Sequence, residues 1–144
     1  MSATPFRDMG RPLADDTADG LASATVAYLL EAMPRGEYLA WVAEASSSDV
    51  IGGVGAQLRR ILPRVRDAGE GLELGPEAIV VNVYVRRDWR RRGVADALMR
   101  SLLDALGARG VRRIVLHASA EGRRLYERLG FVQTNEMRLA PPTR

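Results

Sequence analysis

A cluster of arginines and a glycine follows an apolar run in the second half of the chain, and this combination could bind an anion. Residues 78–85 read AIVVNVYV, as in a β-strand, and residues 88–95 read DWRRRGVA. A strand that enters a helix through such a turn leaves the first N–H groups of the helix unpaired, at the positive end of the helix dipole. Gly93 lets an anion approach the backbone, and Arg90, Arg91 and Arg92 add donors that fit phosphate oxygens. The sequence therefore predicts a site for a phosphate-bearing ligand.

A second block of residues agrees with this interpretation and narrows it. Arg90-x-x-Gly93-x-Ala95 resembles the R/Q-x-x-G-x-G/A signature of the GCN5-related N-acetyltransferases, the GNAT family. Residues 119–131, SAEGRRLYERLGF, look like the later N-x-x-A-x-x-L-Y-E-x-x-G-F segment of the same family. The two motifs occur in the family's order, with one helix and one strand expected between them. Two motifs in the right order are much more specific than either one alone.

The resemblance implies that acetyl-CoA is the co-substrate. In the family, the pyrophosphate of acetyl-CoA lies on the first motif, and its pantetheine lies between two splayed strands. The residues of this chain that would contact it are Val83, Tyr84, Val85, Arg90, Arg91, Arg92, Gly93, Val94, Ala95, Ser119, Gly122, Leu125 and Tyr126. Ser119 stands where the family most often has Asn, and its hydroxyl could instead cap the helix that follows.

Two catalytic roles follow from the same resemblance. A backbone N–H near Val85 would polarise the thioester carbonyl as an oxyanion donor. Tyr126 matches the tyrosine that the family uses as general acid toward the leaving thiolate of CoA. A tyrosine pKa of about 10 lies above a thiol pKa of about 8.5, so complete proton transfer is uphill. Tyr126 could therefore act as a hydrogen-bond donor in the transition state, and an anchoring role in the short helix is the alternative.

The general base is left open by the sequence. Histone-type members of the family carry a Glu early in the central strand, and the matching position here is Ile79. Glu77 is the nearest carboxylate of the same strand parity, and His117, the only histidine, is chemically suited to the role. A lone histidine on a strand more often has a structural role. Asn82 cannot be a base but could orient a water molecule.

Composition bounds the remaining possibilities. The 144 residues fit one domain, residues 1–144, and 47% of them are hydrophobic, as in a globular protein. No apolar run approaches the roughly 20 residues that span a bilayer, and the N-terminus lacks the apolar core of a signal peptide. We therefore expect a cytoplasmic protein without a membrane partner. The absence of cysteine excludes thiolate metal sites and a cysteine acyl intermediate, and no metal is expected.

The basic residues raise the question of a nucleic-acid partner. The 21 basic residues are all arginine, the net charge is +3, and the arginines concentrate in the second half of the chain. Nucleic-acid binding is one interpretation of such a patch. Against it, Trp89 is the only aromatic residue that interleaves with the arginines, and no nucleic-acid fold signature is present. The phosphates of acetyl-CoA explain the patch, so no nucleic-acid partner is expected.

The pattern of apolar residues and chain breakers predicts the order of elements. The predicted elements are a helix over Leu21–Met33, strands over Tyr38–Ala45 and Val50–Leu62, a loop over Pro63–Pro76, a strand over Ala78–Val85, a helix over Arg92–Leu106, a strand over Val111–Ala118, a short helix over Ala120–Leu129 and closing strands within Val132–Leu139. This order is that of the α/β (α+β) GNAT fold. The fold has a central mixed, mostly antiparallel sheet flanked by helices, with a V-shaped splay between two parallel strands.

The N-terminal segment departs from the family pattern. Family members usually open with an additional strand and helix, and residues 1–20 do not read as a strand. Either the first strand is missing, or the gene start is placed late, or a partner chain covers that edge of the sheet. A homodimer would protect the edge from uncontrolled pairing.

These observations predict an N-acetyltransferase that transfers acetyl directly from acetyl-CoA to an amine of a small molecule in a ternary complex. The apolar Ile79 disfavours a protein acceptor, and the acceptor would reach the site between the Leu21–Met33 helix and the Pro63–Pro76 loop, where Glu70 and Glu73 could attract a cation. A protein or peptide N-acetyltransferase and a CoA-binding regulatory module without catalysis are the alternatives.

Overall fold

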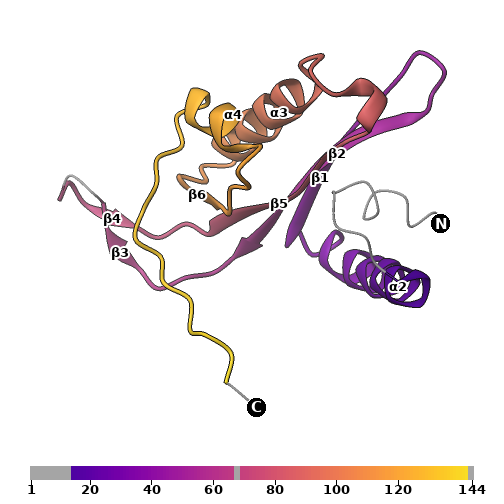
Figure 1. The fold of residues 1–144 in the computed structure, drawn as a ribbon. Coiled ribbons are helices and arrows are strands. Elements are labelled where there is room, and N and C mark those ends of the chain that lie inside the picture. Colours follow the sequence, from indigo (N-terminus) through magenta and orange to yellow (C-terminus); the bar gives the residue numbers. More distant parts are fainter. Residues whose placement is uncertain (1–13, 67–68, 143–144) are drawn as a thin grey trace.

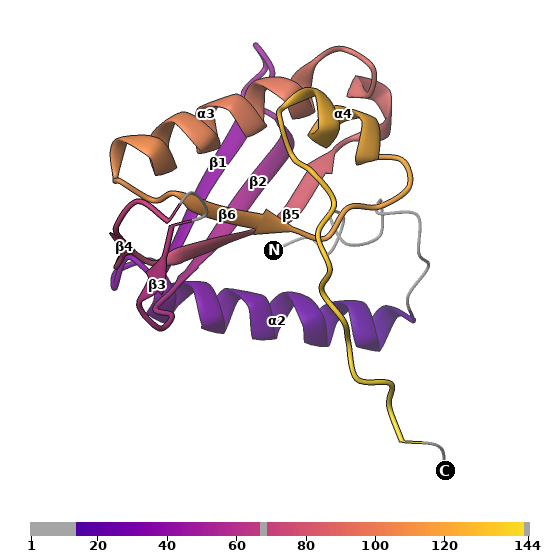
Figure 2. The ribbon, with the colours of Figure 1, turned by 90° about the vertical axis from the view of Figure 1, so that its left-hand side faces the viewer.

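A four-stranded sheet with the strand order β1-β2-β5-β6 forms the centre of the computed structural model, which describes residues 14–66 and 69–142. The elements are α2 (Asp15–Ala32), β1 (Tyr38–Glu44), β2 (Val50–Arg59), β3 (Arg64–Val65), β4 (Leu72–Glu73), β5 (Glu77–Val85), a 3₁₀ turn (Arg87–Trp89), α3 (Val94–Ala108), β6 (Arg113–Leu116) and α4 (Arg123–Arg128). Helices α3 and α4 lie on one face of the sheet and α2 lies across the other (Figures 1 and 2). The layers are those predicted for an α/β fold with flanking helices.

The main core lies between the sheet and α3. Helix α3 buries an apolar stripe, Leu98, Met99, Leu102 and Leu106, at the spacings of three and four that the sequence predicted. Strands β2 and β5, the residues just before β6, and α4 supply the other buried residues of this cluster. They are Val54, Ala56, Ala78, Val80, Val111 and Tyr126. Helix α3 packs on β2 and β5 at the centre of the sheet. This packing places the start of α3 beside the end of β5.

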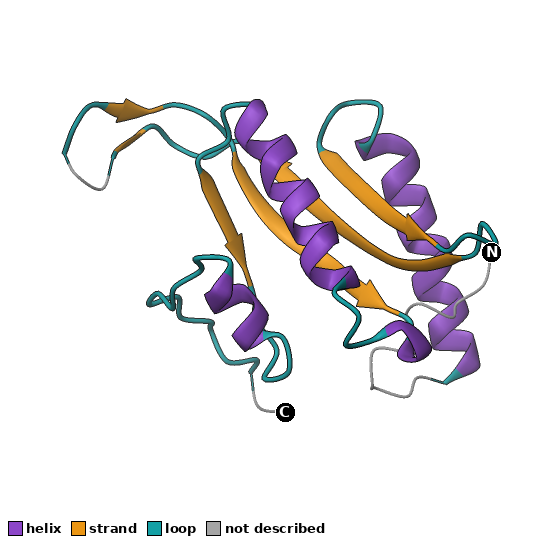
Figure 3. Ribbon diagram, turned by 90° about the horizontal axis from the view of Figure 1, so that it is seen from above, coloured by secondary structure: helices purple, strands orange, loops and turns teal. Residues whose placement is uncertain are grey.

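The sheet is antiparallel except where β5 meets β6. Strands β1, β2 and β5 pair antiparallel, whereas β5 and β6 pair in parallel over only four residues each, from Glu77 opposite Arg113 to Val80 opposite Leu116. Strand β5 then continues to Val85, where β6 has already ended. Figure 3 shows the short strand β6 diverging from the rest of the sheet toward α4. The predicted splay between two parallel strands is confirmed.

A β-bulge interrupts β5 at the point where the splay begins. Gly53 of β2 pairs with Tyr84 and Gly55 pairs with Val81, so β5 contains one residue more than its partner between these pairs. Asn82 lies in this stretch with a φ of 55°, a left-handed conformation that is uncommon for residues other than glycine. The bulge turns the backbone of β5 just after the last residue that pairs with β6. It therefore shapes the mouth of the splay.

The first helix begins earlier than the sequence predicted. Helix α2 starts at Asp15 rather than Leu21 and contains Gly20, a residue type that usually weakens a helix. Asp15 and Asp16 in its first turn favour this start, because acidic side chains stabilise the positive end of a helix. The side chains that α2 buries are small, Ala18, Ala22 and Ala32, so their apolar signal in the sequence is weak.

The prediction of closing strands within Val132–Leu139 is wrong. No residue of this range forms a strand, and the apolar side chains of Val132, Met137 and Leu139 are 81%, 94% and 93% exposed. The polar residues 133–136 separate Val132 from Met137, so the segment has little continuous apolar surface to bury in a sheet. The predicted Pro63–Pro76 loop also differs in part, since β3 and β4 form a short two-stranded ribbon within it.

Strand β1 forms one edge of the sheet in the part of the chain that the structure describes. Within the described range 14–142, β1 is paired only with β2, and the first element is the helix α2. The segment before residue 14 lies outside the described residues. No helix of the described part of the chain is long and apolar enough to cross a membrane.

Candidate functional site

The start of α3 presents free backbone N–H groups to solvent. The first backbone bond of the helix runs from the N–H of Ala97 to the carbonyl of Gly93, at 3.0 Å, so the N–H groups of Val94, Ala95 and Asp96 have no partner within the helix. Gly93 is the N-cap and has no side chain to cap them, and its φ of 78° turns the chain into the helix. A Cβ at Gly93 would meet nothing within 4 Å, so the space beside this residue at the start of the helix is open. An anion can occupy it.

Two of the three arginines around this turn make contacts with neighbouring residues. Arg90 donates from Nε to the carbonyl of Val85 at 3.1 Å, which ties the turn to the end of β5. The guanidinium of Arg92 lies over the ring of Trp89, 4.8 Å from its centroid. Arg91 is exposed and, with a φ of 63°, adopts a left-handed conformation before Gly93. Two residues near each other with positive φ direct successive N–H groups to one side of the turn, as in other anion-binding turns.

The end of β5 points a backbone donor into the splay. The N–H of Arg86 donates to the carbonyl of Ile51 at 2.8 Å, and Val85 is the strand partner of Gly52. Because N–H groups alternate in direction along a strand, the N–H of Val85 points away from β2. It therefore faces the side of β5 that β6 no longer covers. Val83, two residues earlier, packs its side chain against the core, so its main chain can line the splay as well.

Tyr126 reaches the core from α4. It is 8% exposed, it belongs to the same buried cluster as Leu98 of α3, and its ring meets that of Phe131 edge to face at 6.1 Å. Leu125 and Val94 pack against the same cluster, which draws the starts of α3 and α4 toward each other. Burial raises the pKa of the Tyr126 hydroxyl above its ordinary value, so the group keeps its proton and remains a donor.

The loop before α4 holds the ring of Tyr126 in place. Ser119 accepts a hydrogen bond from the N–H of Gly122 at 3.1 Å, so its hydroxyl caps the short helix as the sequence suggested. A Cβ at Gly122 would lie 2.8 Å from Cε2 of Tyr126, so only glycine fits there without displacing the ring. At the other end, Gly130 has a φ of 99° and the N–H of Phe131 donates to the carbonyl of Tyr126 at 3.0 Å. These contacts form a Schellman-type cap at the end of α4.

Glu77 occupies a position that does not suit a general base. Its carboxylate is 2% exposed and forms ion pairs with Arg59 of β2 and Arg113 of β6, which lie on either side of β5. Burial by itself raises the pKa of Glu77, but the hydrogen bonds and charges of Arg113 and Arg59 outweigh it, and the net pKa is lowered. A lowered pKa makes a weaker base. Glu77 also lies where β5 and β6 pair, four residues before the splay, and its contacts fit a structural role.

His117 lies one residue beyond the end of β6 and is exposed. Its Nε2 atom is 3.6 Å from a carboxylate oxygen of Glu136, and both side chains are more than half exposed. Such a position offers ready proton exchange with solvent. Within residues 14–66 and 69–142, no three acidic or histidine side chains gather in a way that could hold a metal ion.

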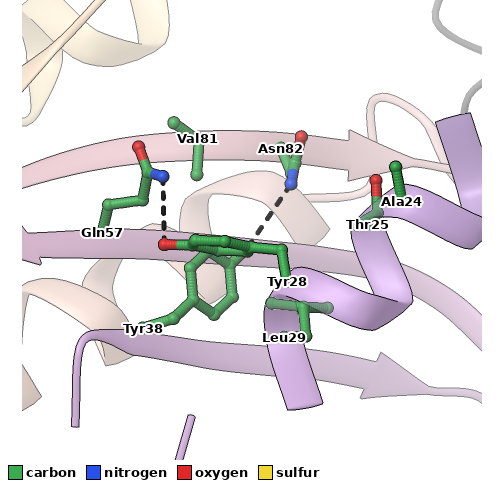
Figure 4. Close-up of a pocket in the computed structure, with 8 residues that line it drawn as sticks. All are labelled: Ala24, Thr25, Tyr28, Leu29, Tyr38, Gln57, Val81 and Asn82. Carbon is green, nitrogen blue, oxygen red and sulfur yellow. Dashed lines mark hydrogen bonds between the residues drawn. The ribbon is translucent and has the colours of Figure 1, made fainter. Parts of the chain in front are cut away.

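A pocket of about 340 Å³ opens on the α2 face of the sheet, beside the bulge. Its lining consists of Ala24, Thr25, Tyr28, Leu29, Tyr38, Gln57, Val81 and Asn82 (Figure 4). The sequence had pointed to Asn82 as a residue that could orient a water molecule and to the first helix as one wall of the acceptor site. The expected second wall is different, because residues of the Pro63–Pro76 segment do not line this pocket. Glu73 of that segment is nearly buried and lies 3.7 Å from Arg66.

Two tyrosines and two amides form a connected set in this pocket. Gln57 donates from Nε2 to the hydroxyl of Tyr28 at 3.1 Å, and Asn82 donates from Nδ2 to the hydroxyl of Tyr38 at 3.5 Å (Figure 4). The two rings meet edge to face, with centroids 6.0 Å apart and planes at 88°. Burial raises the pKa of Tyr38, the hydrogen bond from Asn82 lowers it by less, and the net pKa lies above the ordinary value.

Sequence reasoning missed Tyr38 and Gln57. Tyr38 reads as an ordinary strand residue, and its reach across β2 follows from a glycine on that strand. A Cβ at Gly55 would lie 1.7 Å from the hydroxyl oxygen of Tyr38, so the phenol lies directly over this glycine on its way to Asn82. A glycine inside a strand often marks such a close approach. Gly55 was the available signal for the pocket.

The fold and the site define an acyltransferase that uses acetyl-CoA. Residues 36–133 match the family model of the acetyltransferase (GNAT) domain, and the chain therefore belongs to the GNAT family. A search among curated protein sequences finds no match to this chain.

Solved structures with the same fold agree with this assignment. A GCN5-related N-acetyltransferase from Ralstonia eutropha is 27% identical with a TM-score of 0.74, over 96% of this chain and 86% of that one. A predicted acetyltransferase with acetyl-CoA from Clostridium acetobutylicum is 20% identical with a TM-score of 0.74, over 96% and 82%. An aminoglycoside acetyltransferase from an uncultured soil metagenomic sample is 22% identical with a TM-score of 0.64, over 99% and 85%. The resemblance noted in the sequence is confirmed, and so is the enzyme class.

Proposed function

We propose that this enzyme transfers the acetyl group of acetyl-CoA directly to the amine of a small molecule. The observation that carries the proposal is the position of the pocket at Val81 and Asn82. These residues belong to the bulge at the mouth of the splay, and the anion-binding turn lies at the end of the same strand, after Val85. An acetyl group held along β5 and an amine held in the pocket would therefore meet at the bulge.

The proposed reaction needs two donors on the acetyl-CoA side. The amine nitrogen attacks the thioester carbonyl, a C–N bond forms, the C–S bond breaks, and the nitrogen loses one proton. The N–H of Val85 faces the splay and can donate to the oxygen that becomes negative in the transition state. The hydroxyl of Tyr126 can donate to the leaving sulfur. Its raised pKa favours hydrogen-bond donation over complete proton transfer, since the thiolate is the weaker base.

The described residues that line the pocket include no carboxylate to take the proton of the acceptor, and none of them is ionised at neutral pH. A neutral pocket itself assists deprotonation, since removing an ammonium from water lowers its pKa. Water is then a sufficient proton acceptor. The amide oxygen of Asn82 can orient such a water, because its NH₂ group is directed to Tyr38.

The size of the pocket supports a small acceptor over a protein. Its volume of about 340 Å³ lies at the lower end of the range for sites that enclose small ligands, about 300–1,000 Å³. Helix α2 covers one side of it through Ala24, Thr25 and Tyr28, where a peptide acceptor would need an open groove. The aminoglycoside acetyltransferase with the same fold acts on a small molecule. A catalytically silent CoA-binding module is the alternative, and only turnover distinguishes it.

The test of this proposal combines turnover with cofactor binding. The wild-type enzyme should release CoA when acetyl-CoA is mixed with a panel of small primary amines, and acetyl-CoA should raise its melting temperature by mass action. Gly93→Glu should abolish both effects, because it adds bulk and negative charge in front of the free N–H groups of α3.

Gly110→Glu is the matched control, since Gly110 lies just beyond the other end of α3, has a φ of 76°, close to the 78° of Gly93, and a Cβ there also meets nothing within 4 Å. Each melting temperature is compared with that of the same variant without ligand. An unchanged shift in Gly93→Glu would refute the anion site, and binding of acetyl-CoA without CoA release from any amine would favour the silent module.

A further inference from the structure

The lining of the α2 pocket restricts the kind of amine that it can hold, and this inference rests on the proposed function. We infer that the acceptor is a monoamine with a compact apolar or aromatic body, rather than a polycation or a phosphorylated sugar. Three properties of the pocket lead to this class: its charge, its aromatic walls and its remaining hydrogen-bond acceptors.

The charge of the pocket excludes multiply charged acceptors. All eight lining residues are uncharged, from Ala24 and Thr25 on α2 to Val81 and Asn82 on β5. An aminoglycoside carries several ammonium groups, and each one taken from water needs a carboxylate or an equivalent partner. A sugar phosphate would need cationic donors, but the arginines described above surround the start of α3 and do not line the pocket. A single amine on a neutral body avoids the free-energy cost of burying several unpaired ammonium groups and that of burying an unpaired phosphate.

The aromatic residues suit an apolar body. Tyr28 is 40% exposed and stands at the pocket with its ring perpendicular to that of the buried Tyr38. Perpendicular rings offer one face and one edge to a third ring or an alkyl chain, and such contacts add to the hydrophobic effect. A protonated amine can also approach the face of a tyrosine ring as a cation before it loses its proton. Leu29 and Val81 complete the apolar part of the lining.

The polar groups of the pocket suit one amine. The NH₂ groups of Gln57 and Asn82 already donate to the hydroxyls of Tyr28 and Tyr38. Their carbonyl oxygens remain as acceptors, and Figure 4 shows both side chains over the two rings. Each of these neutral carbonyl oxygens can accept one N–H of an amine. They cannot satisfy a ligand that carries several ammonium groups.

The test compares three amine acceptors of different charge. Initial rates of CoA release are measured with phenethylamine, kanamycin and glucosamine 6-phosphate, and binding of each to the CoA-saturated enzyme is measured by calorimetry. We expect kcat/KM for phenethylamine to exceed the other two by roughly tenfold or more, the range that separates a fitting from a non-fitting pocket. Kanamycin or glucosamine 6-phosphate as the better substrate would overturn the inference and leave the acetyltransferase function intact.

Two variants test whether the pocket itself makes this selection. Tyr28→Ala should lower kcat/KM for phenethylamine roughly tenfold with an unchanged KM for acetyl-CoA. Leu30→Ala, on an exposed part of α2 outside the pocket, should change neither. Gln57→Glu adds a carboxylate of the same shape and should shift the preference toward kanamycin. An unchanged preference in both pocket variants would contradict the inference.

The binding measurement separates the inference from the proposed function. Binding of phenethylamine that is lost in Tyr28→Ala, without CoA release from any amine, would support the ligand class and refute acetyl transfer. No binding and no turnover with phenethylamine would refute the ligand class, and acetyl transfer would be refuted as well only if no other amine released CoA.

Discussion

We propose that Tyr126 combines a structural role and a chemical role in one side chain. Its ring packs into the core beside Phe131, with Gly122 leaving room for it, and its hydroxyl belongs to the segment that the family motif identifies. The raised pKa of the hydroxyl keeps it protonated throughout the physiological range. A group that stays protonated can donate a hydrogen bond to a developing thiolate at every pH at which the amine is reactive.

Replacing Tyr126 by phenylalanine separates the two roles. Tyr126→Phe keeps the ring and should leave the melting temperature and the affinity for acetyl-CoA close to those of the wild type. Turnover at saturating substrate should fall by roughly 10²-fold, because the lost donor acts mainly in the transition state. Steady-state kinetics with calorimetry for acetyl-CoA measures both quantities. Wild-type turnover in this variant would show that the hydroxyl has no part in catalysis.

At the scale of elements, Glu77 joins three strands at the end of the sheet where the splay is closed. Its carboxylate pairs with Arg59 on β2 and Arg113 on β6, and it lies on β5 between them. The parallel pairing of β5 and β6 is only four residues long. The ion pairs therefore reinforce the short region that keeps β6 attached, while the other ends of the same strands remain apart.

Glu77→Gln should destabilise the fold at neutral pH, by about 2 kcal/mol in urea unfolding, because it leaves two arginines without their buried partner. The lowered pKa of Glu77 gives the sign of the pH dependence. Its contribution is fully present above the pKa of an unfolded glutamate, about 4.3, and is lost as the pH falls through the lower folded value. The difference between wild type and variant should therefore narrow only below about pH 4.

The control for this prediction is the same substitution in an exposed ion pair. Glu127 lies 2.9 Å from Arg123 on α4, and both side chains are more than half exposed. Glu127→Gln should change the unfolding free energy by less than about 0.5 kcal/mol, as exposed pairs usually do. An equal loss of unfolding free energy in the two variants at neutral pH would mean that the ion pairs of Glu77 stabilise the fold no more than an exposed pair does.

At the scale of the whole molecule, the exposed edge of the sheet bears on the association of the chain. Strand β1 is an edge in the described part of the structure, and Val42 in its middle is 60% exposed. An uncovered edge with apolar residues tends to pair with another chain. We propose that two copies of this chain associate through β1.

Light scattering after size exclusion should then give the mass of a dimer for the wild type. Val42→Lys should give the mass of a monomer, because a charged side chain at the centre of an edge strand opposes pairing. Leu139→Lys is a control at an equally exposed residue of the C-terminal segment, far from β1 in the sequence. A monomeric wild type, or dimers in both variants, would exclude association through this edge.

The sequence by itself determined the family, the turn that we propose to bind an anion, and most of the elements. These features depend on local signals: the free N–H groups after Gly93, the apolar stripe of α3, and the glycine cap after α4. A local signal is complete in a short stretch of sequence, so it can be interpreted without the rest of the fold. The splay followed from the family resemblance, and the structure confirmed it through the four-residue pairing of β5 and β6.

Only the tertiary structure decided which distant side chains meet. Glu77 was a base candidate until its two arginines, 18 residues before it and 36 after it, proved to be its neighbours. Tyr38 reaches Asn82 only because Gly55 on the strand between them has no side chain. The closing strands fail for a related reason, since a strand exists only where a partner edge accepts it. Contacts of this kind depend on strand register and on packing between elements. Neither can be predicted from the spacing of residues along the chain.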